Sequence, residues 1–399
     1  MDTATDSKMT FSRATWWAWA VLPLLLLGAA IWLFIQFNPM QSLTGGQPPV
    51  EELSIQRVEL RPEGMIVHVV NGGPEPVTIA QVLVDEAYWS FSIEPGRTLS
   101  RLERATVQIP YHWVQGEAHE IRLITSTGVT FDYTVDVAVE TPRSTLSRWL
   151  LFALIGAFVG IIPVGLGLMW FPLLRQLRNQ AMNFILALTV GLLVFLLVDT
   201  ALEGIEIAEQ VPDIFQAVPL VFFAGLLSFL VLMAAGRRSD VRDGSTPQGR
   251  RWIATAIAIG IGLHNLGEGM AIGAAIATGE AALGSFLVIG FTLHNITEGV
   301  GIGAPMAEDR PGVARLAGLT LLAGAPAIFG TWMGGFSYSP LLAVTFLAIG
   351  AGAILQVIVE VGRLLLSDAE GTVPALSSWV NIGGVTTGLA VMYLTALLV

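Results

Sequence analysis

The sequence predicts an all-α polytopic membrane protein with an eight-helix core, preceded by an N-terminal transmembrane anchor and a small all-β sandwich domain. Its 399 residues are 53% hydrophobic and 13% charged, with a mean hydropathy of +0.68, which is typical of polytopic membrane proteins. One apolar run long enough to cross a bilayer lies near the N-terminus, and further such runs fill residues 149–399. Between them, residues 50–142 carry short alternating apolar segments separated by turn residues, as strands do.

The N-terminal segment is predicted to be a membrane anchor. Residues 1–13 are polar and contain a lysine and an arginine, so positive-inside reasoning places this N-terminus in the cytoplasm. The apolar run at 14–37 is longer than a signal-peptide core, and we interpret it as an uncleaved anchor, with cleavage as an open alternative. Residues 38–49, with paired glycines and paired prolines, are a predicted linker.

Residues 50–142 predict a β-sandwich of immunoglobulin-like size outside the cytoplasm. The alternating segments Met65–Val70 and Val77–Val84 flank the turn signal Asn71-Gly72-Gly73-Pro74. The histidines of this module are His68, His112 and His119. Because scattered surface histidines and acids are usually solvated, metal capture by the module is the less favoured interpretation. The partner of the module is not indicated by its sequence.

The core after Arg148 is predicted to cross the membrane eight times. The expected spans are residues 149–173, 181–208, 214–236, 252–277, 282–305, 313–335, 340–364 and 376–398. Arginines fall on alternate connections, which positive-inside reasoning assigns to the cytoplasm. The other connections hold Glu209, Asp213 and Glu280 and no basic residue. The β-module and the C-terminus are therefore expected outside, beside an acidic mouth that concentrates cations.

A repeated motif is the main functional signal. GIGLHNLGEGMAIGA is followed by GFTLHNITEGVGIGA, and each copy spaces a histidine and a glutamate i, i+4, with about 5–6 Å between Cβ atoms on one helix face. The pairs are His264 with Glu268 and His294 with Glu298. The sequence midpoint of His264 and Glu298 is Ala281, and so is the midpoint of Glu268 and His294. Ala281 lies in the predicted turn between the two runs. Antiparallel helices folded there would bring two imidazoles and two carboxylates into one box inside the membrane.

A divalent cation is the expected partner of this box. A carboxylate at mid-helix in a membrane costs on the order of 2.5–3.5 kcal/mol, and neither apolar run contains Lys or Arg to pair with it. Mutual His–Glu hydrogen bonding is the alternative. The chain has no cysteine, so imidazole and oxygen ligands favour Zn, Fe(II) or Mn over Cu(I). The formal net charge of -11 argues against nucleic-acid binding.

Four further acids are candidates for an ion pathway. Asp199, Glu203 and Glu206 are spaced i, i+4, i+7 and form one stripe towards the outer end of the second core span. They predict a ladder of cation sites, although Glu206 alone is better explained as interfacial. Glu360 lies in the seventh span, where Arg363 follows closely enough to pair with it.

The paired motifs carry a family resemblance. His264-Asn265-x-x-Glu268-Gly269 and His294-Asn295-x-x-Glu298-Gly299, on the fourth and fifth expected spans, resemble the zinc/iron-permease (ZIP) family of divalent-metal transporters. The resemblance covers residues 149–399 and excludes the anchor and the β-module. It implies an eight-helix core, usually dimeric, that moves zinc, iron or manganese towards the cytoplasm by displacing one helix bundle against another.

The resemblance also implies a ligand set. Its principal metal site would comprise His264, Glu268, His294 and Glu298, with Asn265 and Asn295 beside it. Asp199 and Glu203 stand where the family commonly has Asp followed by His. Ala325 replaces a glutamate common before the proline of the sixth span, and many members have an acid at the position of Asn295. One strong metal per core is therefore expected.

These observations predict a transporter of divalent transition-metal cations, zinc above all, in the plasma or inner membrane. The metal is the expected substrate, and no catalytic residues are expected. The protein is expected to form a homodimer in the bilayer. The first alternative is an intramembrane zinc-dependent hydrolase, in which the same ligands would activate water. Against it, the chain lacks His-Glu-x-x-His, and two near-identical half-sites suit binding better than one-sided chemistry. The second alternative is a receptor or assembly protein whose β-module is active and whose core is a metal-stabilised scaffold.

Overall fold

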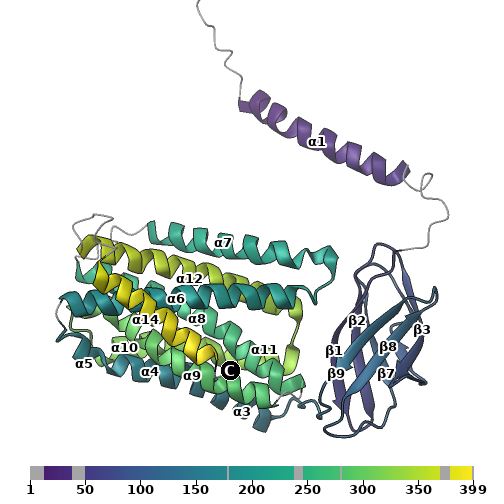
Figure 1. The fold of residues 1–399 in the computed structure, drawn as a ribbon. Helices are drawn as coiled ribbons and strands as arrows, with labels where there is room; N and C mark the ends of the chain where they lie inside the picture. The colour runs from purple at the N-terminus through teal and green to yellow at the C-terminus, as the bar shows by residue number, and fades with distance from the viewer. Residues whose placement is uncertain are drawn as a thin grey trace, which may run out of the picture. The chain divides into compact units, whose positions relative to one another are not determined.

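The computed structural model describes residues 13–37, 50–177, 179–237, 246–278, 281–368 and 378–397. The chain forms two compact units, Met1–Val50 and Glu51–Val399 (Figure 1). In the first unit, helix α1 (Arg13–Phe37) coincides with the predicted anchor and exposes its apolar side chains from Val21 onward. The rest of the predicted N-terminal segment and the predicted linker at 38–49 lie outside the described residues.

The second unit begins with the β-module, whose predicted antiparallel β-structure is confirmed. Its strands are β1 (Leu53–Arg61), β2 (Gly64–Asn71), β3 (Val77–Val84), β4 (Ala87–Tyr88), β5 (Ser92–Glu94), β6 (Thr98–Leu99), β7 (Arg104–Ile109), β8 (His119–Thr125) and β9 (Thr130–Val135). One sheet has the order β1-β2-β7-β5 and the other β4-β3-β8-β9, with β6 paired to β3. Buried residues such as Val67, Ile79, Val107 and Leu123 form the shared core. β8 alternates buried and half-buried residues because only one face of its sheet covers that core.

Asn71 fastens the turn that joins the two sheets. Its Nδ2 donates to the carbonyl oxygens of Glu75 at 2.8 Å and Leu99 at 2.9 Å, and its Oδ1 accepts from the Gly73 N–H at 2.9 Å. The side chain is fully buried.

We expect Asn71→Ala to lower the free energy of unfolding of the module by about 2–4 kcal/mol, because buried backbone groups lose their partners. Denaturant titration of the full chain, followed by tryptophan fluorescence, would measure this. The exposed Gln108→Ala is the control, and equal midpoints would contradict the expectation.

The core is built from helices. They are α3 (Leu146–Gly156), the π-helical η1 (Ala157–Ile161), α4 (Ile162–Met169), α5 (Phe171–Leu174), α6 (Asn179–Ala208), α7 (Ala217–Arg237), α8 (Pro247–Thr278), α9 (Ala281–Gly303), α10 (Val313–Gly324), α11 (Pro326–Ser337), α12 (Pro340–Asp368) and α14 (Trp379–Ala396). The short 3-10 helices are η2 (Asp213–Phe215) and η3 (Ala304–Met306). Among the described residues, six helical segments are long and apolar enough to cross a membrane, which indicates a multi-pass membrane protein.

These six segments do not include α8 or α14, so the count of eight spans stays a prediction. The six are Leu146–Leu174, Gln180–Ala208, Asp213–Ala235, Gly284–Met306, Val313–Ser337 and Pro340–Leu366. The apolar run of α8 is interrupted by His264, Asn265 and Glu268, whose polarity lowers the mean hydropathy of the helix. Nevertheless, α8 packs against α9, α10, α11 and α12.

Two expected spans are not continuous α-helices. The first contains the π-helical turn Ala157–Ile161 and a further break at Trp170 between α4 and α5. The sixth is divided between α10 and α11 at Pro326. Proline lacks the N–H that would continue the helical hydrogen bonds, and its ring crowds the preceding turn. The sequence periodicity did not predict either interruption.

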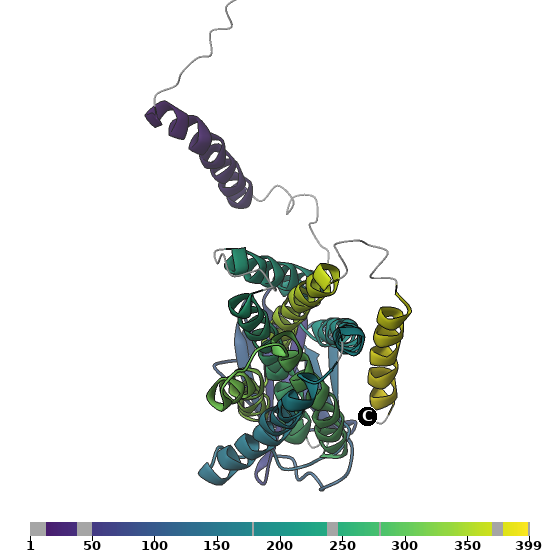
Figure 2. The same cartoon turned by 90° about the vertical axis from the view of Figure 1, so that its left-hand side faces the viewer.

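The packing of the helices divides the core into two groups. In the first, which we call the motif group, α8 packs against α9, α10 and α11, α4 packs against α9, and α3 packs against α11. In the second, the α6 group, α6 packs against α12 and α14, and α7 packs against α12. Figure 1 shows α7 and α12 on one side of the bundle and α3, α4 and α9 on the other. In Figure 2, the yellow helix at the edge of the bundle is α14, which packs beside α6. The principal contact between the groups is α8 against α12.

Candidate metal centre

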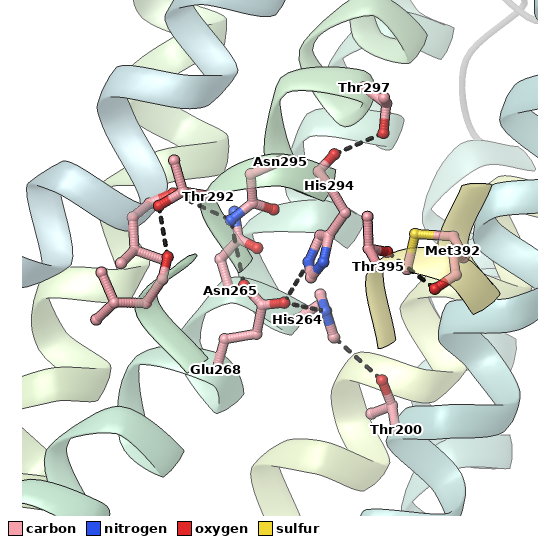
Figure 3. A network of polar contacts seen from close by, with 12 residues as sticks. Thr200, His264, Asn265, Glu268, Thr292, His294, Asn295, Thr297, Met392 and Thr395 are labelled. Atoms are coloured by element: carbon pink, nitrogen blue, oxygen red, sulfur yellow. Dashed lines mark hydrogen bonds and ion pairs between the residues drawn. The ribbon is translucent and has the colours of Figure 1, made fainter. Parts of the chain in front are cut away.

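Helices α8 and α9 bring together three of the predicted ligands (Figure 3). The Oε1 of Glu268 lies 3.0 Å from Nε2 of His264 and 2.6 Å from Nε2 of His294. The second oxygen, Oε2, accepts a hydrogen bond from Nδ2 of Asn295 at 3.2 Å. All three side chains of the His/Glu group are buried, and one ligand atom from each lies within 4.8 Å of the others. Two imidazoles from adjacent helices therefore meet at one carboxylate oxygen.

Glu298, the fourth predicted ligand, lies outside this three-residue group. It follows His294 by one helical turn, and its side chain is only 5% exposed. Neither of its carboxylate oxygens has a hydrogen-bond partner among the residues that the structure describes. Burying a carboxylate without a partner is costly, and such groups in proteins are normally paired or bound to a metal. Glu298 therefore needs a partner that the described side chains around it do not provide.

Asn265 and Asn295 are fully buried, and their amide nitrogens donate hydrogen bonds to backbone carbonyls of neighbouring helices. Nδ2 of Asn265 donates to the carbonyl of Ala323 at 3.0 Å, and Nδ2 of Asn295 donates to the carbonyl of Val159 at 3.1 Å. Val159 lies in the π-helical turn, and Ala323 lies just before the α10–α11 break, where regular helical hydrogen bonding is interrupted. Within the described part of the chain, the Oδ1 atom of each asparagine has no hydrogen-bond partner. Their nitrogens thus have a structural role, and their oxygens are the atoms available to a cation.

The sequence did not predict the contact between Thr200 and His264. Oγ1 of Thr200 lies 3.2 Å from Nδ1 of His264, the ring nitrogen opposite the one that faces Glu268. A partner on the second ring nitrogen orients a histidine and is common behind metal ligands. Thr200 directly follows Asp199 in the acidic stripe, and this adjacency was the available signal. The contact also joins the α6 group to the motif group.

The acidic stripe on α6 lies beside a cavity of about 810 Å³. Glu203 and Glu206 line this cavity together with Gly267 and Met270 of α8. Glu203 is half-buried, whereas Asp199 and Glu206 are exposed, and none of the three belongs to the His/Glu group. Two of the three acids of the stripe therefore line a cavity that also reaches the residue directly before Glu268. Of the other acids expected at the mouth, Glu209 and Asp213 are exposed, and Glu280 lies outside the described residues.

Glu360 is separate from the His/Glu group. It is buried on α12, and its Oε1 lies 3.1 Å from Nη1 of Arg363. The pairing considered from the sequence is thus present. A carboxylate with its own cation on the next turn is less available to a transported ion.

Two histidines of the module each face a single acid. Nδ1 of His119 lies 2.8 Å from Oδ2 of Asp85, and Nε2 of His68 lies 3.2 Å from Oε1 of Glu59. The hydrogen bond from His68 is the largest of the contacts that lower the pKa of Glu59 from its ordinary value to about 2. Within the part of the chain that the structure describes, the group of His264, Glu268 and His294 is the one set of three or more histidine or acidic side chains close enough together to share a metal ion.

In comparisons with known proteins, no family model matches this chain and no curated protein sequence matches it. Its function is therefore argued from the chemistry of the site.

Proposed function

We propose that this protein transports divalent transition-metal cations, zinc above all, towards the cytoplasm through the His264–Glu268–His294 site. The observation that carries the proposal is the meeting of two imidazole nitrogens and one carboxylate oxygen, from three buried side chains on two adjacent helices. Nitrogen and oxygen ligands of this kind suit Zn, Fe(II) and Mn. Polar groups of this kind inside a membrane bundle mark ion pathways by default.

The unpartnered oxygens favour a cation over mutual hydrogen bonding. Contacts between the histidines and Glu268 would satisfy Oε1 of that residue without any ion. These contacts leave both oxygens of Glu298 and the Oδ1 atoms of Asn265 and Asn295 buried with no hydrogen-bond partner among the described residues. One cation near these acceptors would compensate several of them at once, which supports a metal as the missing partner.

The proposed path follows the acidic stripe. A hydrated cation would pass Glu206 and Glu203 in the cavity and lose water at the His/Glu site. Release to the other side needs the motif group to move relative to the α6 group, and a site that binds weakly enough to let the ion leave. The expected topology has a cytoplasmic N-terminus with the β-module and the C-terminus outside, in a homodimer within the plasma or inner membrane.

Metal uptake by vesicles containing the purified protein tests this function. With a panel of divalent ions outside, we expect zinc to accumulate well above the level of protein-free vesicles. His264→Ala should return uptake to that level, because it removes one ligand and the contact with Thr200. His112→Ala, at an exposed position of the module, is the matched control and should transport normally. Undiminished uptake by His264→Ala would refute the proposal, and chelator-sensitive peptide turnover would favour the hydrolase.

A further inference from the structure

The 810 Å³ cavity lies between the β-module and the core, and we call it the vestibule. Its module wall comprises residues 53–57 of β1 and residues 131–134 of β9. Both are edge strands, because β1 and β9 each lie at one end of their sheet. Its core wall includes Glu203 and Gly267. The module is therefore part of the enclosure through which the proposed ion approaches its site.

The module is attached to the α6 group through the α6–α7 connection. Oε1 of Glu52 accepts a hydrogen bond from the backbone N–H of Asp213 at 2.9 Å, and Oγ of Ser54 lies 3.5 Å from the carbonyl oxygen of Gln210. A Cβ at Gly72 would lie 2.6 Å from Cβ of Pro212, so the two backbones approach closely. This attachment combines a charged acceptor with direct packing.

A second attachment reaches the motif group. Nη1 of Arg57 donates to the carbonyl oxygen of Phe336 at 3.2 Å, at the C-terminal end of α11. Nη2 of the same arginine lies 3.1 Å from Oε1 of Glu59. Burial lowers the pKa of Arg57 from its ordinary value. The last carbonyls of a helix lack helical partners and carry partial negative charge, so a guanidinium is a favourable donor to them.

A bulge in β1 allows one strand to make both attachments. Ser54 pairs with Val70 and Arg57 pairs with His68, with the register shift between Ile55 and Arg57. In a regular strand, residues three apart point to opposite faces, but one inserted residue restores them to the same face. Ser54 and Arg57 can therefore both face the core.

We propose that the β-module braces the two helix groups at the vestibule, and that its attachment to the α6–α7 connection is the releasable one. The module would stay with the motif group while the α6 group slides past it. This inference rests on the proposed function for its role in transport. The chain joins the module covalently to α3 of the motif group, because Thr141, whose Oγ1 accepts from the backbone N–H of Leu60 at 2.9 Å, lies shortly before that helix. The α6–α7 attachment consists of hydrogen bonds and close packing, so it breaks first when the groups move. The brace favours the conformation in which the vestibule reaches the neighbours of Glu268.

Paired cysteines in the naturally cysteine-free chain test the brace. Ser54→Cys with Gln210→Cys joins the module to the α6 group, and Arg57→Cys with Ser337→Cys joins it to the motif group. A short bis-methanethiosulfonate reagent should cross-link both pairs. Ser92→Cys with Ser337→Cys is the control and should not cross-link, because β5 lies at the opposite edge of the sheet from β1. Failure of the Arg57/Ser337 pair to react, while Ser54/Gln210 reacts, would overturn the brace without any measurement of transport.

Uptake by the cross-linked proteins tests the releasable attachment. The Ser54/Gln210 cross-link should reduce zinc uptake at least ~10-fold, a change of about 1.4 kcal/mol, and a reducing agent should restore it. The Arg57/Ser337 cross-link should leave uptake within about 2-fold of the same protein before reaction, a change below about 0.5 kcal/mol. Uptake that survives the Ser54/Gln210 cross-link would overturn the brace alone. No uptake by any uncross-linked protein would instead overturn the proposed function, on which the role of the brace in transport depends.

Discussion

Glu268→Ala is expected to reduce metal uptake about 100-fold or more, to the level of protein-free vesicles, while the protein still inserts in the membrane. Oε1 of Glu268 is the atom that both imidazoles face, at 3.0 Å and 2.6 Å. Removing it deletes the negative charge between two ligands and leaves Asn295 without one acceptor. The loss of a charged contact of about 3 kcal/mol corresponds to this fold-change. Uptake of labelled zinc and calorimetric binding to the purified protein would measure it.

The variant Glu268→Gln distinguishes a metal site from a group that is held together by His–Glu hydrogen bonds alone. Glutamine keeps the length of the side chain and one carbonyl acceptor but loses the charge. If hydrogen bonds alone hold the histidines, the variant should remain close to wild type in stability and in uptake. A metal site predicts instead that binding is lost while the fold persists. Glu117→Gln, at an exposed position of the module, is the matched loss of charge and should transport normally. Full uptake by Glu268→Gln would contradict the assignment of this carboxylate as a ligand.

Gly330→Leu is expected to prevent the assembly of the motif group. A Cβ at Gly330 would lie 2.1 Å from the carbonyl oxygen of Leu266 and 2.8 Å from the backbone nitrogen of Met270. In the opposite direction, a Cβ at Gly269 would lie 2.3 Å from the carbonyl oxygen of Ala327. Because the obstructing atoms belong to the backbone, α8 and α11 must separate to admit a side chain. Small residues at such contacts let membrane helices pack closely.

The expected cost of this substitution is about 3 kcal/mol or more, at the upper end of overpacking effects. Size-exclusion chromatography and thermal unfolding in detergent would show aggregation or a large fall in Tm. Gly318→Leu on α10 is the matched control, since a Cβ there meets no heavy atom within 4 Å. Equal Tm values for the two variants would contradict the close packing of α8 on α11. Because α8 carries two of the three clustered residues, loss of this packing should also abolish zinc binding.

Local patterns predicted the module strands well. The apolar segment Val77–Val84 coincides with β3, and Met65–Val70 lies within β2. Such segments are recognisable because alternation along a strand reports directly on which side chains face a core. By contrast, the interruptions at Ala157–Ile161 and Pro326 were not predicted from hydropathy, which is insensitive to how the backbone hydrogen bonds are made.

The repeated motif also predicted part of the geometry of the His/Glu group. The shared midpoint of Glu268 and His294 placed these residues level on antiparallel helices, and their atoms meet at 2.6 Å. The same reasoning put His264 level with Glu298, but Glu298 is not in the clustered group. Spacing gives the height of a residue along a helix, whereas the rotation of that helix decides which side chains reach a common point. The pairing of Glu360 with Arg363 was anticipated from the sequence, because residues three apart on one helix are close enough to interact.

Composition and short-range periodicity were sufficient to place a β-module ahead of long apolar helices and to single out the His/Glu motifs, because these properties belong to segments of neighbouring residues. Folding of the whole chain was needed to join Thr200 to His264, to seat Arg57 against the end of α11, and to form the vestibule between strand edges and helices. Those contacts link residues far apart in the chain, so they depend on how helices and sheets pack rather than on any pattern within one of them.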